Sequence, residues 1–162
     1  MDIYLVRHAI AGERDPERWP DDSQRPLTKK GIRRFTEAAA GLVTVVPEVD
    51  LVLASPYRRA WQTATILEEA GWPAPQRLDE LAQGEAGGLF RALLPYKDRD
   101  SIALVGHEPY LSRFVTAIAG NAPWREMKKG GAVRLQQPQL SLTAAAELRW
   151  YLPPSILRKL GR

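Results

Sequence analysis

The chain has 162 residues, of which 44% are hydrophobic and 26% are charged, and this balance excludes an intrinsically disordered protein. It contains no cysteine, so disulfide bridges and thiolate metal sites are also excluded. Lys and Arg outnumber Asp and Glu by 23 to 19, and the net charge of +4 suits an anionic ligand.

The length fits one domain, and we predict a single domain over residues 1–162. The N-terminus lacks the basic start and long apolar stretch of a secretory signal. No run approaches the roughly 20 apolar residues needed to cross a bilayer, so we expect a cytoplasmic protein without a membrane partner. The basic residues are scattered along the chain, which argues against a nucleic-acid partner.

The first predicted strand is the apolar run 3–6, which ends just before Arg7 and His8. The charged segment 12–26 follows, and we predict a solvated loop there. The sequence leaves open whether this loop closes over a functional site.

A helix is predicted to begin after Thr28, which can cap it, and Gly31 in its first turn indicates the close approach of another segment. A second strand, residues 51–54, leads to a second helix, which we expect Ser55 to cap and Pro56 to begin. The apolar faces of both helices follow from residues at helical spacing: Ile32, Phe35, Ala39 and Leu42 in the first, and Tyr57, Ala60, Trp61, Ala64 and Leu67 in the second.

A third strand, residues 102–105, precedes a third helix, which is predicted to run from Pro109 to a stop at Gly120-Asn121. The alternation over residues 132–151 predicts two further strands, antiparallel at an edge of the sheet. The repeated strand–helix units predict an α/β fold, a three-layer α/β/α sandwich with a mostly parallel central sheet. The apolar face of the third helix comprises Leu111, Phe114, Val115 and Ile118.

Polar side chains follow each of the three predicted strands, and both histidines of the chain are among them. In open α/β sheets, ligands bind outside the carboxyl ends of the strands, so these side chains should share one pocket. Arginine binds phosphate as a planar fork, and nearby cations favour the neutral, nucleophilic form of histidine. The pattern therefore predicts phosphoryl transfer at a site drawn from Arg7, His8, Ser55, Arg58, Arg59 and His107.

Other chemistries lack their motifs in this chain. There is no G-x-x-x-x-G-K-[ST] loop, no H-E-x-x-H helix and no G-x-S-x-G elbow. Two histidines without cysteine are too few for most zinc sites, unless carboxylates complete the coordination shell. We therefore expect neither a metal nor a cofactor.

Four segments resemble, in the same order, motifs of the histidine phosphatase superfamily, the phosphoglycerate mutase-like proteins. The resemblance spans residues 3 to about 110, and the short chain and its R-P-L-T sequence are most similar to the SixA-type phosphohistidine phosphatases. It implies a phosphoglycerate mutase-like fold without a large inserted subdomain. The segments are Leu5 to Ala9, similar to R-H-G; Arg25 to Gly31, similar to R-x-L-T-x-x-G; Ser55 to Ala64, similar to S-x-x-x-R-A-x-Q-T-A; and Val105 to Pro109, similar to the second histidine motif.

The resemblance implies a role for each matching residue. His8 would be the nucleophile that forms a covalent phosphohistidine intermediate. Arg7, Arg59 and His107 would bind the phosphate. Of the two adjacent arginines, Arg59 matches the family position because it directly precedes Ala60, and we expect Arg58 to face solvent. Ala9 stands where the R-H-G motif has glycine, and alanine can adopt fewer backbone conformations than glycine.

The general acid is less well defined by the motifs. Glu80 is the first choice because its segment is similar to the family's L-x-E, and Glu85 and Glu108 are alternatives. No acid is needed if the substrate is phosphohistidine, because imidazole leaves more readily than an alkoxide.

Only a short segment separates Glu80 from His107, so the resemblance implies a phosphatase rather than a mutase. We expect it to dephosphorylate phosphohistidine on a signalling protein, for example on a histidine-phosphotransfer domain. The alternatives are a phosphatase for a small phosphorylated metabolite and a non-catalytic phosphate-binding module of the same fold, with a nucleic-acid binder third. The sequence does not indicate the oligomeric state.

Overall fold

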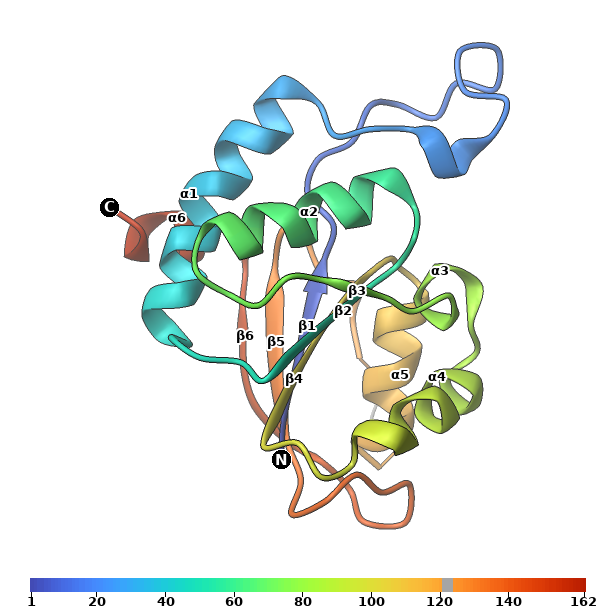
Figure 1. Cartoon of the computed structure of the whole chain (residues 1–162), viewed down its shortest axis with the longest axis vertical. Coiled ribbons are helices and arrows are strands. Elements are labelled where there is room, and N and C mark those ends of the chain that lie inside the picture. Colours follow the sequence, from blue (N-terminus) through green and yellow to red (C-terminus); the bar gives the residue numbers. More distant parts are fainter. Residues whose placement is uncertain (121–123) are drawn as a thin grey trace.

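The computed structural model describes residues 1–120 and 124–162, so Asn121 in the predicted helix stop lies outside the described residues. The strands form one six-stranded sheet in the order β3-β2-β4-β1-β5-β6 (Figure 1). Strands β1 to β4 are parallel, whereas β5 is antiparallel to β1 and β6 is antiparallel to β5. The strands are β1 (Asp2–Arg7), β2 (Leu51–Ala54), β3 (Gln76–Arg77), β4 (Ser101–Gly106), β5 (Ala132–Gln136) and β6 (Glu147–Leu152).

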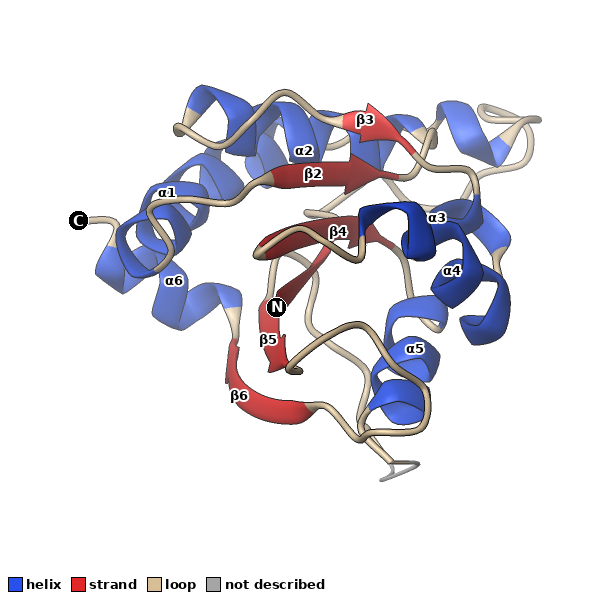
Figure 2. Ribbon diagram, turned by 60° about the horizontal axis from the view of Figure 1, so that its bottom comes forward, coloured by secondary structure: helices blue, strands red, loops and turns tan. Residues whose placement is uncertain are grey.

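Helices cover both faces of this sheet (Figure 2). The predicted α/β/α sandwich with a mostly parallel sheet and two antiparallel edge strands is therefore confirmed, and no large insertion interrupts the described residues. One face carries α1 (Lys29–Val45), α2 (Arg58–Glu69) and α6 (Pro154–Leu160), and the other carries α3 (Glu80–Gln83), α4 (Ala86–Leu93) and α5 (Tyr110–Ile118). Two short 3-10 helices, η1 (Asp22–Gln24) and η2 (Leu94–Tyr96), lie in connections.

The core has two halves because side chains alternate across each strand. In β1, Tyr4 and Val6 pack with α1, α2 and α6, whereas Ile3 and Leu5 pack with the helices of the opposite face. Strands buried on both faces are apolar throughout, which is why the runs were recognisable in the sequence. This packing fixes the carboxyl ends of β1, β2 and β4, where the functional side chains lie.

The predicted start of α1 is confirmed. Thr28 caps the helix, and its Oγ1 accepts a hydrogen bond of 2.9 Å from the backbone N–H of Gly31. A Cβ atom on Gly31 would overlap the carbonyl oxygen of Ile10, so the expected close approach is present.

The predicted start of α2 is wrong. The helix begins at Arg58, after an uncapped Tyr57, and Pro56 precedes it. The Ser55 hydroxyl accepts from the N–H of Tyr57, which precedes the helix, and also contacts His107, so it makes no hydrogen bond to an N–H within α2.

Two residues assigned to apolar faces are also corrected. Ile32 is 39% exposed and Trp61 is 37% exposed, because the buried stripes pass through Gly31 and Thr63 instead. The apolar face predicted for α5 is buried throughout.

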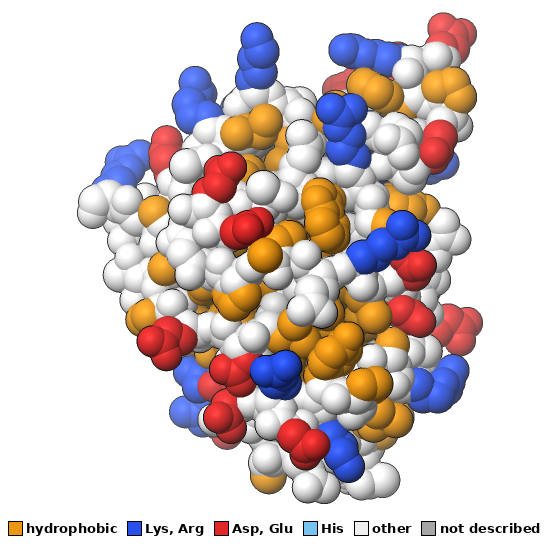
Figure 3. Space-filling model, viewed as in Figure 1, with side chains coloured by type: hydrophobic (Ala, Val, Ile, Leu, Met, Phe, Trp, Pro, Cys, Tyr) orange, Lys and Arg blue, Asp and Glu red, His pale blue; other side chains and the backbone are white. Residues whose placement is uncertain are grey.

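No helix in the described part of the chain is long and apolar enough to span a membrane. On the face shown in Figure 3, acidic and basic side chains are interspersed, with hydrophobic side chains between them.

Candidate active site

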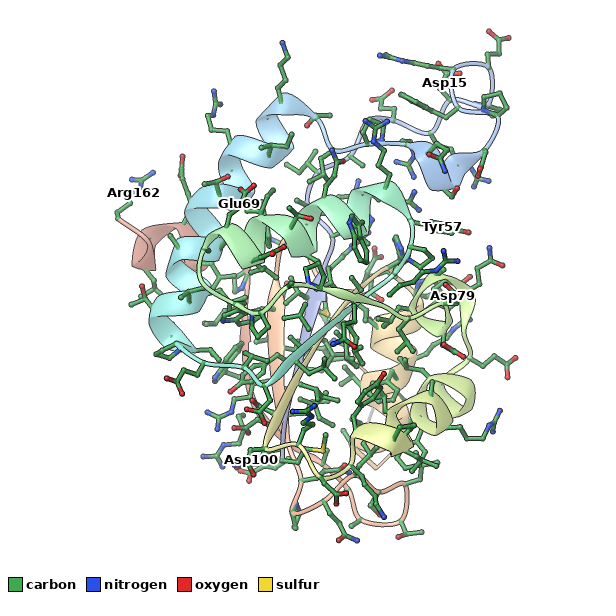
Figure 4. The ribbon with its side chains drawn as sticks, in the orientation of Figure 1. Asp15, Tyr57, Glu69, Asp79, Asp100 and Arg162 are labelled. Carbon is green, nitrogen blue, oxygen red and sulfur yellow. The ribbon has the colours of Figure 1, made fainter. Side chains whose placement is uncertain are left out.

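The order of the strands brings the predicted site residues to one edge of the sheet. Strand β4 lies between β1 and β2, and the three are parallel, so their carboxyl ends are adjacent. Arg7 ends β1 and His8 follows it, His107 directly follows β4, and Arg59 lies in the first turn of α2. The ring centroids of His8 and His107 are 5.1 Å apart. Figure 4 labels Tyr57 at this edge.

The hydrogen bond of His8 defines which of its nitrogens can react. Its Nδ1 lies 2.7 Å from the carbonyl oxygen of Ala9 and is therefore the protonated nitrogen, because a carbonyl only accepts. In the neutral ring, Nε2 then carries a free lone pair. The backbone is fixed as well: the N–H of His8 donates to Gly106, and the N–H of Ala9 donates to Thr63.

His8 is only 6% exposed, and burial lowers its pKa to about 3. The hydrogen bond to Ala9 opposes this shift, and the positive charges of Arg59, Arg7 and Lys129 add to it. The imidazole is therefore neutral at physiological pH, which is the nucleophilic form.

His107 presents its other nitrogen to the site. Its Nε2 is 2.8 Å from the hydroxyl of Ser55, and that hydroxyl already accepts a hydrogen bond from the N–H of Tyr57 at 3.2 Å. We assign the Ser55 proton to the hydrogen bond with Nε2, which places the imidazole proton of His107 on Nδ1. Burial lowers the pKa of His107 to about 2, with His8 and Arg59 contributing.

Arg59 is held by the 12–26 loop. Its guanidinium donates to the carbonyl of Asp22 at 2.9 Å and pairs with the Asp22 carboxylate at 3.2 Å. That carboxylate also pairs with Arg25 at 2.8 Å. The Arg59 guanidinium lies 5.1 Å from the centre of the Tyr57 ring. The 12–26 loop therefore reaches the site through Asp22.

Arg7 is held from the opposite side. Its guanidinium donates to the carbonyl of Met127 and forms an ion pair of 2.7 Å with Glu126, whose side chain is 65% exposed. A cavity of about 570 Å³ borders Arg7 and is lined further by α5 and Trp124.

Three buried side-chain nitrogens of the site lack hydrogen-bond partners within the described residues. They are Arg7 Nε, Arg59 Nε and His107 Nδ1, and the His107 nitrogen is a donor in the tautomer assigned above. Buried donors are normally paired, so a cluster of unpaired donors beside a histidine lone pair suits an oxyanion. The resemblance implies the same three residues as phosphate ligands, and this role stays a prediction.

The three candidate acids differ in their exposure and in their hydrogen bonds. Glu80 begins α3 and is partly exposed, and its carboxylate has no hydrogen bond among the described residues. Glu85 is exposed before α4. Both oxygens of Glu108 accept backbone N–H groups, from Ser112 and Met127, so this carboxylate connects α5 to the following loop. A catalytic role for Glu80 stays a prediction.

Sequence reasoning missed several groups at the site. Asp22 orients Arg59, and Thr63 accepts from Ala9 while donating to the carbonyl of Arg59, which ties the end of β1 to α2. Thr63 lies inside a motif that resembles the family, four residues after Arg59, and this spacing could have indicated it. Asp22 lies in a charged loop, and nothing in the sequence distinguishes it from its neighbours. Arg58 is exposed, as expected.

Among the described residues, no group of three or more His, Asp or Glu side chains is placed to hold a metal ion. The expectation of a site without metal or cofactor stays a prediction.

Comparison with known proteins gives one family. The model of the histidine phosphatase superfamily (branch 1) matches residues 3–102. A protein of Picosynechococcus is 33% identical over 158 residues, which cover 94% of each chain.

Solved structures share the fold over nearly the whole chain. A protein histidine phosphatase, SixA, complexed with tungstate, has a TM-score of 0.82 at 21% identity and covers 96% of this chain and 98% of its own. A phosphoserine phosphatase of Entamoeba histolytica, solved with phosphoserine, has a TM-score of 0.70 at 12% identity with the same coverage. The predicted phosphoglycerate mutase-like fold of the SixA type is thereby confirmed.

Proposed function

Because the chain belongs to the histidine phosphatase superfamily, we propose that it is a metal-independent phosphatase in which His8 carries the phosphoryl group. One observation carries this proposal most directly: the hydrogen bond from His8 Nδ1 to Ala9 leaves Nε2 as an unprotonated nucleophile beside three unpaired donors. The family match supports a phosphatase, and the steps below are inferred from the chemistry of the site.

The reaction has two displacements. In the first, the lone pair of Nε2 forms a bond to phosphorus and the bond from phosphorus to the leaving group breaks. The leaving atom takes a proton from Glu80 or, when it is an imidazole nitrogen, from solvent. In the second, a water oxygen forms a bond to the phosphorus of phosphohistidine and the bond from phosphorus to Nε2 breaks. Inorganic phosphate departs, one proton of the water passes to Glu80 or to solvent, and His8 returns to its neutral form. Arg7, Arg59 and His107 would stabilise the negative charge on the equatorial oxygens through both steps.

We propose phosphohistidine on a protein as the substrate, in the cytoplasm. Its imidazole is a good leaving group, which fits a site whose acid candidate Glu80 is partly exposed and unanchored. The segment from Glu80 to His107 contains only the short elements α3, α4, η2 and β4, so little material encloses the site. A shallow site suits a phosphate presented by a protein surface.

A phosphatase for a small metabolite is the second candidate. The fold of this chain is shared with a phosphoserine phosphatase, and the cavity of about 570 Å³ beside Arg7 could hold a small leaving group. A substrate panel separates the two: faster turnover of a phosphohistidine protein than of phosphoserine and sugar phosphates supports the first, and the reverse order supports the second.

The first test is intact-protein mass spectrometry after brief incubation with phosphoramidate, a small P–N phosphoryl donor, and quenching at neutral pH. We expect an acid-labile phosphoryl adduct on the wild type and on Arg58→Ala, whose side chain is exposed, but none on His8→Ala. An adduct that persists in His8→Ala would assign the nucleophile elsewhere. No adduct and no phosphate release from any substrate would favour a binding module.

A further inference from the structure

A second pocket lies next to the carboxyl end of β1, where His8 is located. It has a volume of about 170 Å³ and is bounded by α1, by α6 and by the turn at residues 128–130, and we call it the α1–α6 pocket. Every charged residue that lines it is basic: Arg34, Lys128, Lys129 and Arg158.

Within residues 1–120 and 124–162, none of these four basic side chains takes part in an ion pair or hydrogen bond, in contrast to Arg7, Arg25 and Arg59. The charge of Glu126 acts on Lys129, but the Glu126 carboxylate itself is paired with Arg7.

Part of the remaining lining is apolar, including Ala9 and the buried ring of Phe35. Arg34 and Arg158 are partly buried, whereas Lys128 and Lys129 are exposed at the rim. Partly buried cations beside an apolar wall are less well hydrated than cations in open solvent, so an anion placed between Arg34 and Arg158 is bound more strongly.

The pocket and the proposed active site share a wall. Ala9 lines the pocket and directly follows His8. The N–H of Gly130 donates to the carbonyls of Arg7 and His8, at 3.0 and 3.1 Å, so the turn that carries Lys129 is fastened to the end of β1. Lys129 is exposed, yet its pKa is lowered by partial desolvation and then by the charges of Arg7, Arg25 and Arg59, which places its ammonium in the same positive field.

We propose that the α1–α6 pocket binds a second anionic group of the substrate, a phosphate or carboxylate carried a short distance from the phosphoryl group that is transferred. The identity of this group as part of the substrate rests on the proposed function. The binding of an oxyanion in the pocket does not, since it follows from the four cations alone. The proposal narrows the substrate class to molecules with at least two negatively charged groups.

Binding is tested first, without turnover. The arginine Nε–Hε signals are followed by NMR during titration with inorganic phosphate, and Arg34→Ala and Arg158→Ala assign the two pocket signals. We expect saturable shifts at Arg34 and Arg158, and none at Arg33, the exposed neighbour on α1. Shifts confined to Arg7 and Arg59, or equal and non-saturating shifts at Arg33 and Arg34, would overturn the proposal.

Kinetics then tests the link to the substrate. Propyl phosphate and 1,3-propanediol bisphosphate are compared with the wild type, Arg34→Ala and the charge-matched control Arg33→Ala. We expect Arg34→Ala to raise KM for the bisphosphate about tenfold, the effect of one charge-assisted contact, and to leave propyl phosphate unchanged. Equal effects on both compounds would overturn the link to the substrate while leaving the pocket as a site for a free anion. If neither compound is turned over although His8 forms its phosphoryl adduct, the link to the substrate is overturned while the proposed function stands, and the NMR titration alone decides the pocket.

Discussion

The ends of β1 and β4 present the same residue type in the same position, yet they offer opposite chemistry. His8 and His107 are both buried, and their rings are 5.1 Å apart. His8 donates through Nδ1 to a carbonyl and turns a lone pair to the site, whereas His107 uses Nε2 for Ser55 and turns an N–H to it. The difference teaches that the hydrogen-bond partner, rather than burial or strand position, assigns the nucleophile and the phosphate donor.

The largest predicted effect separates the two histidines by their roles. His8→Ala removes the nucleophile, so we expect kcat to fall by about 10⁴-fold or more. His107→Ala removes one donor to the developing charge, for which about 10²- to 10³-fold is expected. Steady-state phosphate release measures both, with Arg58→Ala as the control that keeps wild-type rates. Equal losses in the two variants would contradict the assignment of roles.

The second prediction concerns the residue that makes His107 a donor. In Ser55→Ala the proton of His107 is no longer directed to Nδ1, so we expect a mixture of tautomers and a fall in kcat of about tenfold. Ser55→Thr keeps a hydroxyl and should recover most of the rate. The ¹⁵N chemical shifts of the imidazole report the tautomer directly, and unchanged shifts in Ser55→Ala would show that another group sets it.

The sequence predicted the strand ends well because buried parallel strands leave continuous apolar runs, and the residues after them are few and chemically distinct. It could not predict the tautomers, since these depend on Ser55 and Ala9 at distances set by the packed sheet. The misplaced start of α2 has the same origin. The Ser55-Pro56 pair is a usual helix beginning, but the Ser55 hydroxyl contacts the N–H of Tyr57 and a histidine 52 residues away along the chain, and the helix begins two residues later than predicted.

The third prediction is the stability cost of keeping both histidines neutral. Their folded-state pKa values are about 3 and about 2, whereas an unfolded histidine has a pKa near 6.5. Below pH ~6.5 the unfolded chain therefore binds more protons than the folded chain, and the free energy of unfolding falls as the pH is lowered from ~6.5 toward 3. Above pH ~7 this contribution is constant.

Urea unfolding at pH 7, 6 and 5 measures this slope. His8→Asn and His107→Asn each remove one titrating group, so each variant should show a shallower fall between pH 6.5 and 5 than the wild type. A slope unchanged in both variants would mean that the two imidazoles titrate in the folded protein as they do in the unfolded chain.

The smallest predicted effects extend the comparison to the two arginines. Arg59 is held by Asp22, and their side chains are 8% and 32% exposed. Arg7 is held by Glu126, whose side chain is 65% exposed. The Asp22 carboxylate also pairs with Arg25 at 2.8 Å, so removing it raises the local positive charge by one as well as freeing Arg59. We expect the lost orientation of Arg59 to outweigh the added attraction for phosphate. We expect Asp22→Ala to raise KM about fivefold with little change in kcat, and Glu126→Ala to alter neither more than about twofold.

Initial-rate kinetics at two salt concentrations distinguishes orientation from charge in this pair. An ordering effect of Asp22 should persist at high salt, since the contact to Arg59 is largely buried, whereas any effect of the exposed Glu126 should be screened. A lower KM in Asp22→Ala would mean that the carboxylate competes with phosphate for Arg59. In that case the 12–26 loop would hinder phosphate binding at the end of β2. The two arginines would then differ in the effect of their partners, because the acid paired with Arg59 would compete with phosphate and the acid paired with Arg7 would not.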